Sequence, residues 1–164
     1  MHTLATRIAN VFLFALAFCY LIELGGGNYE HINVTRIVSL EPPRTMAMLQ
    51  GPFGFTPRYF WMLFHPLTTL FFVLALAFNW KAVPARRRLL VAAFTIHVLV
   101  SIATFAYFAP ETGKIAAVPF SDTVDAAAQA LARRWANLNL VRLLAYYLAA
   151  GCILLALNRP ATSR

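Results

Sequence analysis

Polar side chains recur inside the apolar stretches of this chain, where each needs a partner or a function because polar groups are costly in a bilayer. One face of the last apolar stretch carries, at steps of four, three and four residues, Trp135, Asn139, Arg142 and Tyr146. An arginine and an amide that converge among apolar side chains are typical of a site for a lipophilic small molecule. Such groups also form interhelical hydrogen bonds, so a purely structural role is the alternative.

Three further stretches carry polar groups that we expect to meet this face. His97 and Thr104 share one side of the third apolar stretch. His65 lies in the second, and Glu23 lies near the end of the first. At a helical rise of ~1.5 Å per residue, a layer roughly 5–10 Å below the outer membrane boundary should contain Glu23, His65, Thr104, Asn139 and Arg142. His97 and Tyr146 should lie deeper, near the midplane.

The apolar stretches themselves predict the fold. Four runs are long enough to cross a hydrocarbon core of ~30 Å as helices of ~20 residues, the first only if it continues through three consecutive glycines. The runs cover residues 8–27, 59–80, 89–108 and 138–157. Because every backbone group in lipid must be satisfied internally, we predict an all-α fold. This fold is a four-helix transmembrane bundle that forms a single integral membrane domain over residues 1–164.

The three connections differ in character. The first is long and rich in proline and glycine, with an apolar interruption at residues 46–49, so we expect an irregular outer loop with room for one short helix. The second, residues 81–88, is short and should join two helices as an antiparallel hairpin. In the third, Ser121 and Asp122 can cap an amphipathic segment that leads into the fourth helix.

Charge separates the two ends of the predicted bundle. One end holds basic residues without any acid, namely Arg7, Lys81, Arg86, Arg87, Arg88, Arg159 and Arg164. The other holds all six acids and carries only +1 of the net charge of +8. By the positive-inside rule, we expect both termini and the second connection in the cytoplasm. Topology thus explains the basic excess, and no nucleic-acid partner is expected. Trp61 and Trp135 should mark the outer interface and Trp80 the inner one.

Metal ligation is a further alternative. The side chains of the types that bind iron, copper or zinc are Glu23, Glu30, His31, His65 and His97. None of them forms a His-x-x-x-His or Glu-x-x-His pair. Haem ligation by two histidines needs matching depth on facing helices, whereas His65 and His97 differ in depth. We therefore assign no metal ligand and no cofactor, and a metal or haem carrier stays open as an alternative function.

Four motifs near the helix ends occur together. Residues 27–30 read Gly-Asn-Tyr-Glu, Pro66 lies in the second apolar stretch, and residues 104–110 begin with threonine and end with proline. The fourth motif, Trp-x-x-Leu-Asn-x-x-Arg at residues 135–142, is the most specific. In this combination the chain resembles the anthrone oxygenase-like family of small four-helix membrane proteins, mostly bacterial. It departs from the family at Glu111, where a small apolar residue often stands.

The resemblance implies a chemistry and a location. Characterised members are similar to cofactor-free oxygenases that convert polycyclic phenolic anthrones to anthraquinones with dioxygen. For this chain we expect a location in a bacterial inner membrane. The reaction begins by removing a proton from a C–H bond beside an aromatic ketone. Glu23 or His65 is then the expected base, and Asn139 with Arg142 should stabilise the enolate oxygen. The expected ligand-binding residues are Tyr29, Glu30, Trp61, His97, Thr104, Trp135 and Tyr146.

Three functions remain open at this point. The protein acts on or binds an aromatic or quinone-like molecule in a pocket open to the outer leaflet, or it is a non-enzymatic accessory or assembly subunit with a membrane-protein partner. The third possibility is the metal or haem carrier. The first function requires a cavity bounded by Glu23, His65 and Arg142. The second requires a closed polar layer in which every group is paired.

Overall fold

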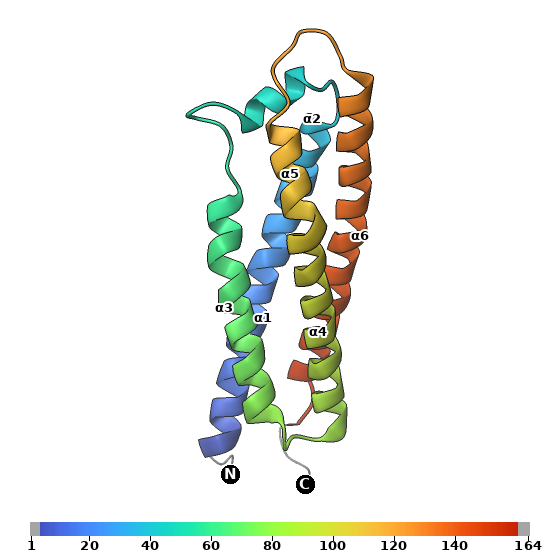
Figure 1. The fold of residues 1–164 in the computed structure, drawn as a ribbon. Helices are drawn as coiled ribbons and strands as arrows, with labels where there is room; N and C mark the ends of the chain where they lie inside the picture. The colour runs from blue at the N-terminus through green and yellow to red at the C-terminus, as the bar shows by residue number, and fades with distance from the viewer. Residues whose placement is uncertain (1–3, 161–164) are drawn as a thin grey trace.

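The computed structural model describes residues 4–160 as a bundle of four long helices (Figure 1). Its elements are α1 (Leu4–Glu30), the π-helix η1 (His31–Thr35), α2 (Arg36–Val38), the 3-10 helix η2 (Arg44–Leu49), α3 (Arg58–Asn79), α4 (Pro84–Ala103), the π-helix η3 (Thr104–Phe108), α5 (Ala109–Ala116) and α6 (Ala126–Leu157). The described residues contain no strand, which confirms the predicted four-helix, all-α class.

Four continuous helical segments are long and apolar enough to cross a membrane, so the chain is an integral membrane protein. The longest, Leu4–Val38, has 35 residues. At ~1.5 Å per residue it measures about 50 Å, well beyond a hydrocarbon core of ~30 Å. Pro84–Ala116 and Ala126–Leu157 are almost as long, whereas Arg58–Asn79 has only 22 residues. Three helices therefore project past the predicted spans at the acid-bearing end, which we call the outer end, and α3 does not.

The projecting helices pack against one another around a second apolar core. Met46 of η2 is fully buried there, which confirms the short helix predicted near residues 46–49. Trp135 lies in the same core and is only 7% exposed, and its Nε1 donates a hydrogen bond to the carbonyl oxygen of Phe108 at 3.3 Å. The prediction that Trp135 marks the membrane interface is therefore wrong. Trp80, at the other end of the bundle, is 56% exposed.

Two helix boundaries differ from the sequence prediction. The cap of α6 is Asp125, not Ser121 or Asp122, because its Oδ1 accepts hydrogen bonds from the amides of residues 127 and 128 at 2.7 and 3.1 Å. The amphipathic segment and the fourth span are thus one helix. The third span continues through Pro110, since the wide turn of η3 directly precedes it and the Ala109 amide donates to the oxygen of Thr104, five residues back.

The bundle is packed unevenly. α1 makes extensive contacts with α3 and α6, and α6 with α4, but α3 and α4 touch each other much less (Figure 1). Gly26 allows the close approach of α1 and α3, since a Cβ atom at this position would lie 2.5 Å from Cε1 of Phe60. As a result, the outer half of α3 is held by α1. α1 also continues through the three glycines to Glu30, as the first predicted span requires.

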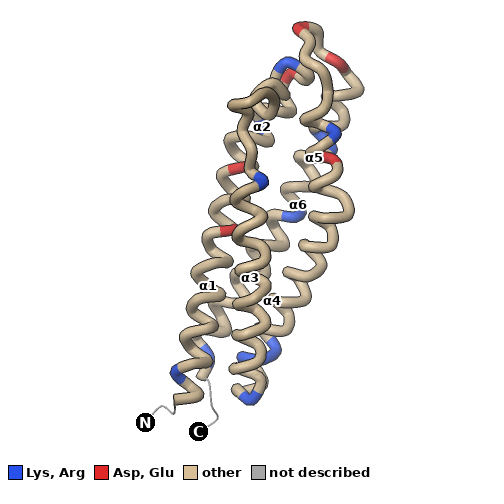
Figure 2. The backbone as a smooth tube through the Cα atoms, turned by 60° about the vertical axis from the view of Figure 1, so that its left-hand side comes forward, with Lys and Arg blue, Asp and Glu red and all other residues tan. Residues whose placement is uncertain are grey.

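The charged residues lie where the sequence predicts. Within residues 4–160, the end of the bundle opposite the acid-bearing end carries Lys and Arg and no acid (Figure 2). Arg164 lies outside the described residues. Arg86 is 2% exposed and donates hydrogen bonds to Oδ1 of Asn10 at 2.8 Å and to the carbonyl oxygen of Arg159 at 3.2 Å. One guanidinium therefore joins α1, α4 and the chain that follows α6.

We expect Arg86→Ala to lower the free energy of unfolding by about 1–3 kcal/mol, because the hydrogen bonds of a buried, charged side chain that join three parts of the bundle are lost. Arg88→Ala, on the exposed side of the same helix, serves as the control and should change it by less than about 0.5 kcal/mol. Denaturant titration of both variants in detergent checks this. Equal stability of the two variants would show that Arg86 does not join the helices.

The predicted orientation is tested by thiol accessibility in intact cells. Thr123 and Ala85 are both exposed and lie at opposite ends of the bundle. We expect Thr123→Cys to react with a membrane-impermeant maleimide and Ala85→Cys to react only after permeabilisation, because the acid-free end should face the cytoplasm. The reverse pattern would show that the acid-bearing end is cytoplasmic.

Candidate functional site

Glu23 and His65 form a hydrogen-bonded pair between α1 and α3. Glu23 is fully buried, and its Oε1 lies 3.1 Å from Nδ1 of His65. A carboxylate at this position favours the imidazole tautomer that carries its proton on Nδ1, which leaves the lone pair on Nε2. Nε2 makes no hydrogen bond within residues 4–160 and is not enclosed, and 13% of the His65 side chain is exposed. The pair can therefore accept a proton at Nε2.

A second contact of the same kind lies further out along these two helices. Trp61 stacks on His65 with ring centroids 5.0 Å apart and an interplanar angle of 23°. Nε1 of Trp61 donates to Oε2 of Glu30 at 2.8 Å, and Glu30 is only 8% exposed. Glu23 and Glu30 are two helical turns apart, and His65 and Trp61 are one turn apart. Two acids of α1 thus hold two stacked rings of α3.

Thr69 connects His65 to His97, a link that the sequence analysis missed. Its Oγ1 donates to the carbonyl oxygen of His65 at 2.8 Å and lies 2.9 Å from Nε2 of His97. Because the hydroxyl proton is used, Thr69 must accept the Nε2–H of His97. The Nδ1 of His97 is then a buried acceptor without a partner. The available signal was the i, i+4 spacing from His65, at which a threonine hydroxyl can bond back to the helix.

Arg142 lies on the other side of the polar layer, between α6 and η3. Its Nη1 is 3.3 Å from Oγ1 of Thr104, and its guanidinium lies 4.4 Å from the centroid of the Phe108 ring. Thr104 and Arg142 are therefore brought together as predicted. Arg142 forms no ion pair with an acid within residues 4–160, and Glu30 lies near enough for its negative charge to act on the guanidinium without direct contact. Glu30 thus connects the two halves of the layer, because it also accepts from Trp61.

From the sequence, Glu23 or Glu111 is the acid expected to neutralise Arg142, and the structure shows that both expectations are wrong. Glu23 pairs with His65, and Glu111 pairs with Lys114 at 2.5 Å. The prediction for Glu111 assumed a regular helix from His97 outward. The π-helix η3 adds an extra residue to one turn, which rotates everything beyond it away from the predicted face.

The remaining predicted residues occupy different surroundings. Asn139 is 4% exposed and makes no side-chain hydrogen bond within residues 4–160, so its amide is available to a ligand. Tyr146 is buried against Tyr20, with ring centroids 5.7 Å apart, and belongs to the inner core with His97. Tyr29 is 59% exposed and lies apart from the site.

The two clearest cavities are both small. One has a volume of about 20 Å³, is lined by Glu30, Thr35 and Trp135 among apolar side chains, and has room for about one water molecule. The other, beside Tyr20, has no free volume. Neither is lined by Glu23, His65 or Arg142, so the wide pocket expected among these three is not seen.

The side chains of the types that bind metal ions do not gather in one place within the described residues. Residues 4–160 contain no group of three or more His, Cys, Asp or Glu side chains placed to hold a metal ion. Nδ1 of His65 is bonded to Glu23 and Nε2 of His97 is bonded to Thr69, so each ring has one nitrogen engaged by a different partner.

Comparison of the chain with protein-family models, with curated proteins and with solved structures gives no match. The resemblance to the anthrone oxygenase-like family therefore stays a hypothesis. It rests on the residues of the Gly-Asn-Tyr-Glu and Trp-x-x-Leu-Asn-x-x-Arg motifs alone.

Glu30 rather than Glu111 should be energetically coupled to Arg142. In a double-mutant cycle of Arg142→Met with Glu30→Gln, we expect a coupling energy of about 0.5–3 kcal/mol, because each change removes the other's electrostatic partner. The matched cycle with Glu111→Gln should be additive within about 0.5 kcal/mol. Denaturant unfolding in detergent measures both, and coupling to Glu111 but not to Glu30 would contradict this arrangement.

Proposed function

We propose that the protein binds a lipophilic aromatic molecule at the level of the outer leaflet and removes a proton from it. The Glu23–His65 pair is the observation that carries this proposal. A buried carboxylate orients the imidazole through Nδ1, and the free Nε2 is the atom that would take the proton. In a purely structural network, both ring nitrogens of the histidine would be expected to make hydrogen bonds.

Within this proposal, the reaction is the oxidation of an anthrone-like methylene to a ketone by dioxygen. Loss of one proton to Nε2 of His65 gives a carbanion that is stabilised as its enolate. The carbanion adds dioxygen, and His65 returns the proton to give a hydroperoxide. Loss of water from the hydroperoxide leaves the quinone carbonyl, so one oxygen atom ends in the ketone and the other in water.

Asn139 and Arg142 are the proposed donors to the enolate oxygen. The Asn139 amide makes no hydrogen bond within the described residues, and the Arg142 guanidinium uses Nη1 on a single hydroxyl. A guanidinium has five N–H donors, so most of them remain for a ligand. Donors fixed by their neighbours stabilise a developing oxyanion without reorganisation.

A non-enzymatic accessory subunit is the second candidate. The observation that favours it is the small size of the cavities, since a bundle held together by its polar layer needs no space for a ligand. The proposed location in a bacterial inner membrane, with both termini in the cytoplasm, is shared by both candidates. They differ in whether His65 can be replaced without loss of function.

We expect His65→Gln to abolish anthrone oxidation, at least about 100-fold, while its midpoint of thermal unfolding in detergent changes little. Glutamine keeps a hydrogen-bonding group for Glu23 but offers no base. His31→Gln, in η1 and outside the pair, is the matched control and should keep wild-type oxidation. Dioxygen consumption with anthrone in proteoliposomes gives the rate. Retained oxidation in His65→Gln, or a collapse of stability with activity intact in the surviving protein, would reject His65 as the base and make it structural. Absence of anthrone oxidation in the wild type would favour the accessory role.

A further inference from the structure

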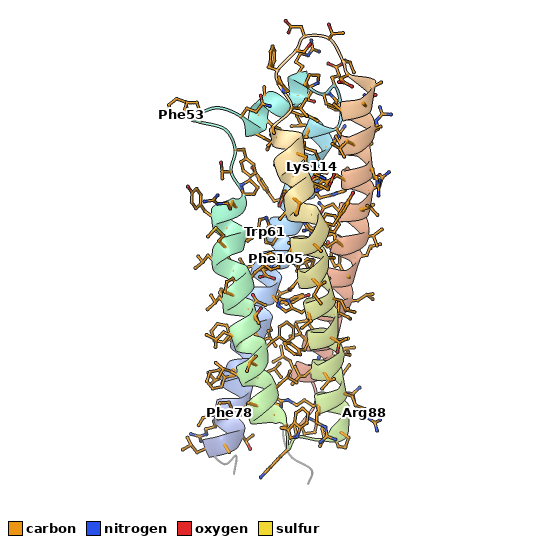
Figure 3. The ribbon with its side chains drawn as sticks, in the orientation of Figure 1. Phe53, Trp61, Phe78, Arg88, Phe105 and Lys114 are labelled. Carbon is orange, nitrogen blue, oxygen red and sulfur yellow. The ribbon has the colours of Figure 1, made fainter. Side chains whose placement is uncertain are left out.

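The larger of the two cavities has a buried hydroxyl without a partner in its wall. The cavity is lined by Glu30 of the polar layer and by Trp135, which belongs to the outer apolar core. Thr35 also lines it, is only 2% exposed, and makes no hydrogen bond through its Oγ1 within residues 4–160. Figure 3 shows Trp61, the partner of Glu30, in the outer half of the bundle but further from the outer end than Lys114. The cavity therefore lies where the polar layer meets the outer core.

The π-helix η1 brings Glu30 and Thr35 to the same side of the chain. Glu30 directly precedes η1 and Thr35 ends it, so the two residues are five positions apart. At roughly 3.6 residues per turn, side chains at this spacing would point about 140° away from each other. The wider turn of a π-helix, with its i→i+5 hydrogen bonds, aligns them instead, and both line the cavity. Such turns occur frequently at functional sites.

The carboxylate of Glu30 accepts fewer hydrogen bonds than it can. Glu30 is 8% exposed, and its Oε2 accepts from Nε1 of Trp61 at 2.8 Å. This is its only side-chain hydrogen bond within residues 4–160, and a carboxylate has about four acceptor sites. Burial of a charged carboxylate is costly unless donors satisfy it. A further donor at Glu30 is therefore expected.

The cavity has the volume and the partners that one water molecule needs. Its volume of about 20 Å³ exceeds the ~10–15 Å³ that a water molecule requires. A water molecule there can donate to Glu30 and accept from the hydroxyl of Thr35. Thr112 also lines the cavity, and its Oγ1 donates to the carbonyl oxygen of Phe108 at 2.8 Å, so its lone pairs can accept the second proton of the water. About three partners are typical of a buried water.

We infer that Glu30, Thr35 and Thr112 bind one buried water molecule between the polar layer and the outer core. The water supplies a donor that stabilises the charged carboxylate of Glu30, and this carboxylate holds Nε1 of Trp61. Because Trp61 stacks on His65, the water site also helps to fix the position of that imidazole ring. No step of the proposed reaction passes through the cavity, so the water site does not depend on that reaction.

A metal cation is the competing occupant. The side chains that line the cavity with oxygen atoms are one carboxylate and two hydroxyls. Hard cations such as Ca²⁺ and Mg²⁺ take about six or more oxygen ligands. The charge of Arg142, which interacts with that of Glu30, also opposes a cation here. Water therefore fits the site better.

The sign of one substitution distinguishes a hydroxyl that holds water from a hydroxyl without a partner. Thr35→Val should lower the midpoint of thermal unfolding in detergent by about 2–4 °C, the shift expected for one lost hydrogen bond. If the hydroxyl has no partner, its removal should leave the midpoint unchanged or raise it. Thr68→Val is the matched control, since Thr68 is fully buried, has no partner for its Oγ1 and lines neither cavity. Its midpoint should stay the same or rise.

NMR of the protein in nanodiscs, with carbon-13 in the threonine methyl groups, detects the water directly. The variants Thr35→Ser and Thr68→Val assign the two signals. We expect magnetisation transfer from water to the methyl group of Thr35 and none to that of Thr68. Absence of transfer to Thr35, or a midpoint of Thr35→Val at or above that of the wild type, would overturn the water site. A wild-type midpoint that falls when choline replaces sodium at equal ionic strength, with no such fall in Thr35→Val, would show a cation instead.

Discussion

A carboxylate buried among apolar helices must be paired, and in this bundle Glu23 is paired with His65. The cost of leaving such a group alone in a bilayer is several kcal/mol, which exceeds what a single helix contact returns. The pairing therefore fixes which side of α3 faces α1. Gly26 makes the approach possible, and the Trp61–Glu30 bond repeats the contact two turns further out on α1. The polar contacts thus act together with the buried apolar residues of α3, Phe72 and Ala75, in fixing its orientation.

The position of α3 has a consequence for α4. The outer core around Met46 and Trp135 holds the projecting ends of the other three helices, and α3 is too short to join it. Its outer half is thus attached to α1 alone, and it diverges from α4 above the Thr69–His97 hydrogen bond. The outer half of α3, which carries His65, therefore depends on its contacts with α1 and not on the outer core.

Sequence patterns predicted the helices and most of the polar layer, because hydropathy and the 3.6-residue repeat act locally. They placed Glu23, His65, Thr104 and Arg142 in one layer, without predicting that Glu23 pairs with His65. They did not predict the partner of Arg142, since η3 shifts the register before Glu111 and nothing in a hydropathy pattern marks a π-helix. Trp135 was assigned to the interface because the length of α6 beyond the membrane was not foreseen. The link through Thr69 was missed because threonines in apolar helices are common and usually bond only to their own backbone.

The central claim is that His65 holds its proton on Nδ1, toward Glu23, and presents an unprotonated Nε2. Nitrogen-15 NMR of histidine-labelled protein in lipid, with His65→Gln used to assign the signals, reports the protonation of each ring nitrogen directly. The account predicts a protonated Nδ1 and an unprotonated Nε2 for His65 at neutral pH, with Nε2 becoming protonated when an acidic phenolic ligand binds. A signal pair in which Nε2 carries the proton and Nδ1 does not would contradict it, because the pair could then not act as a base.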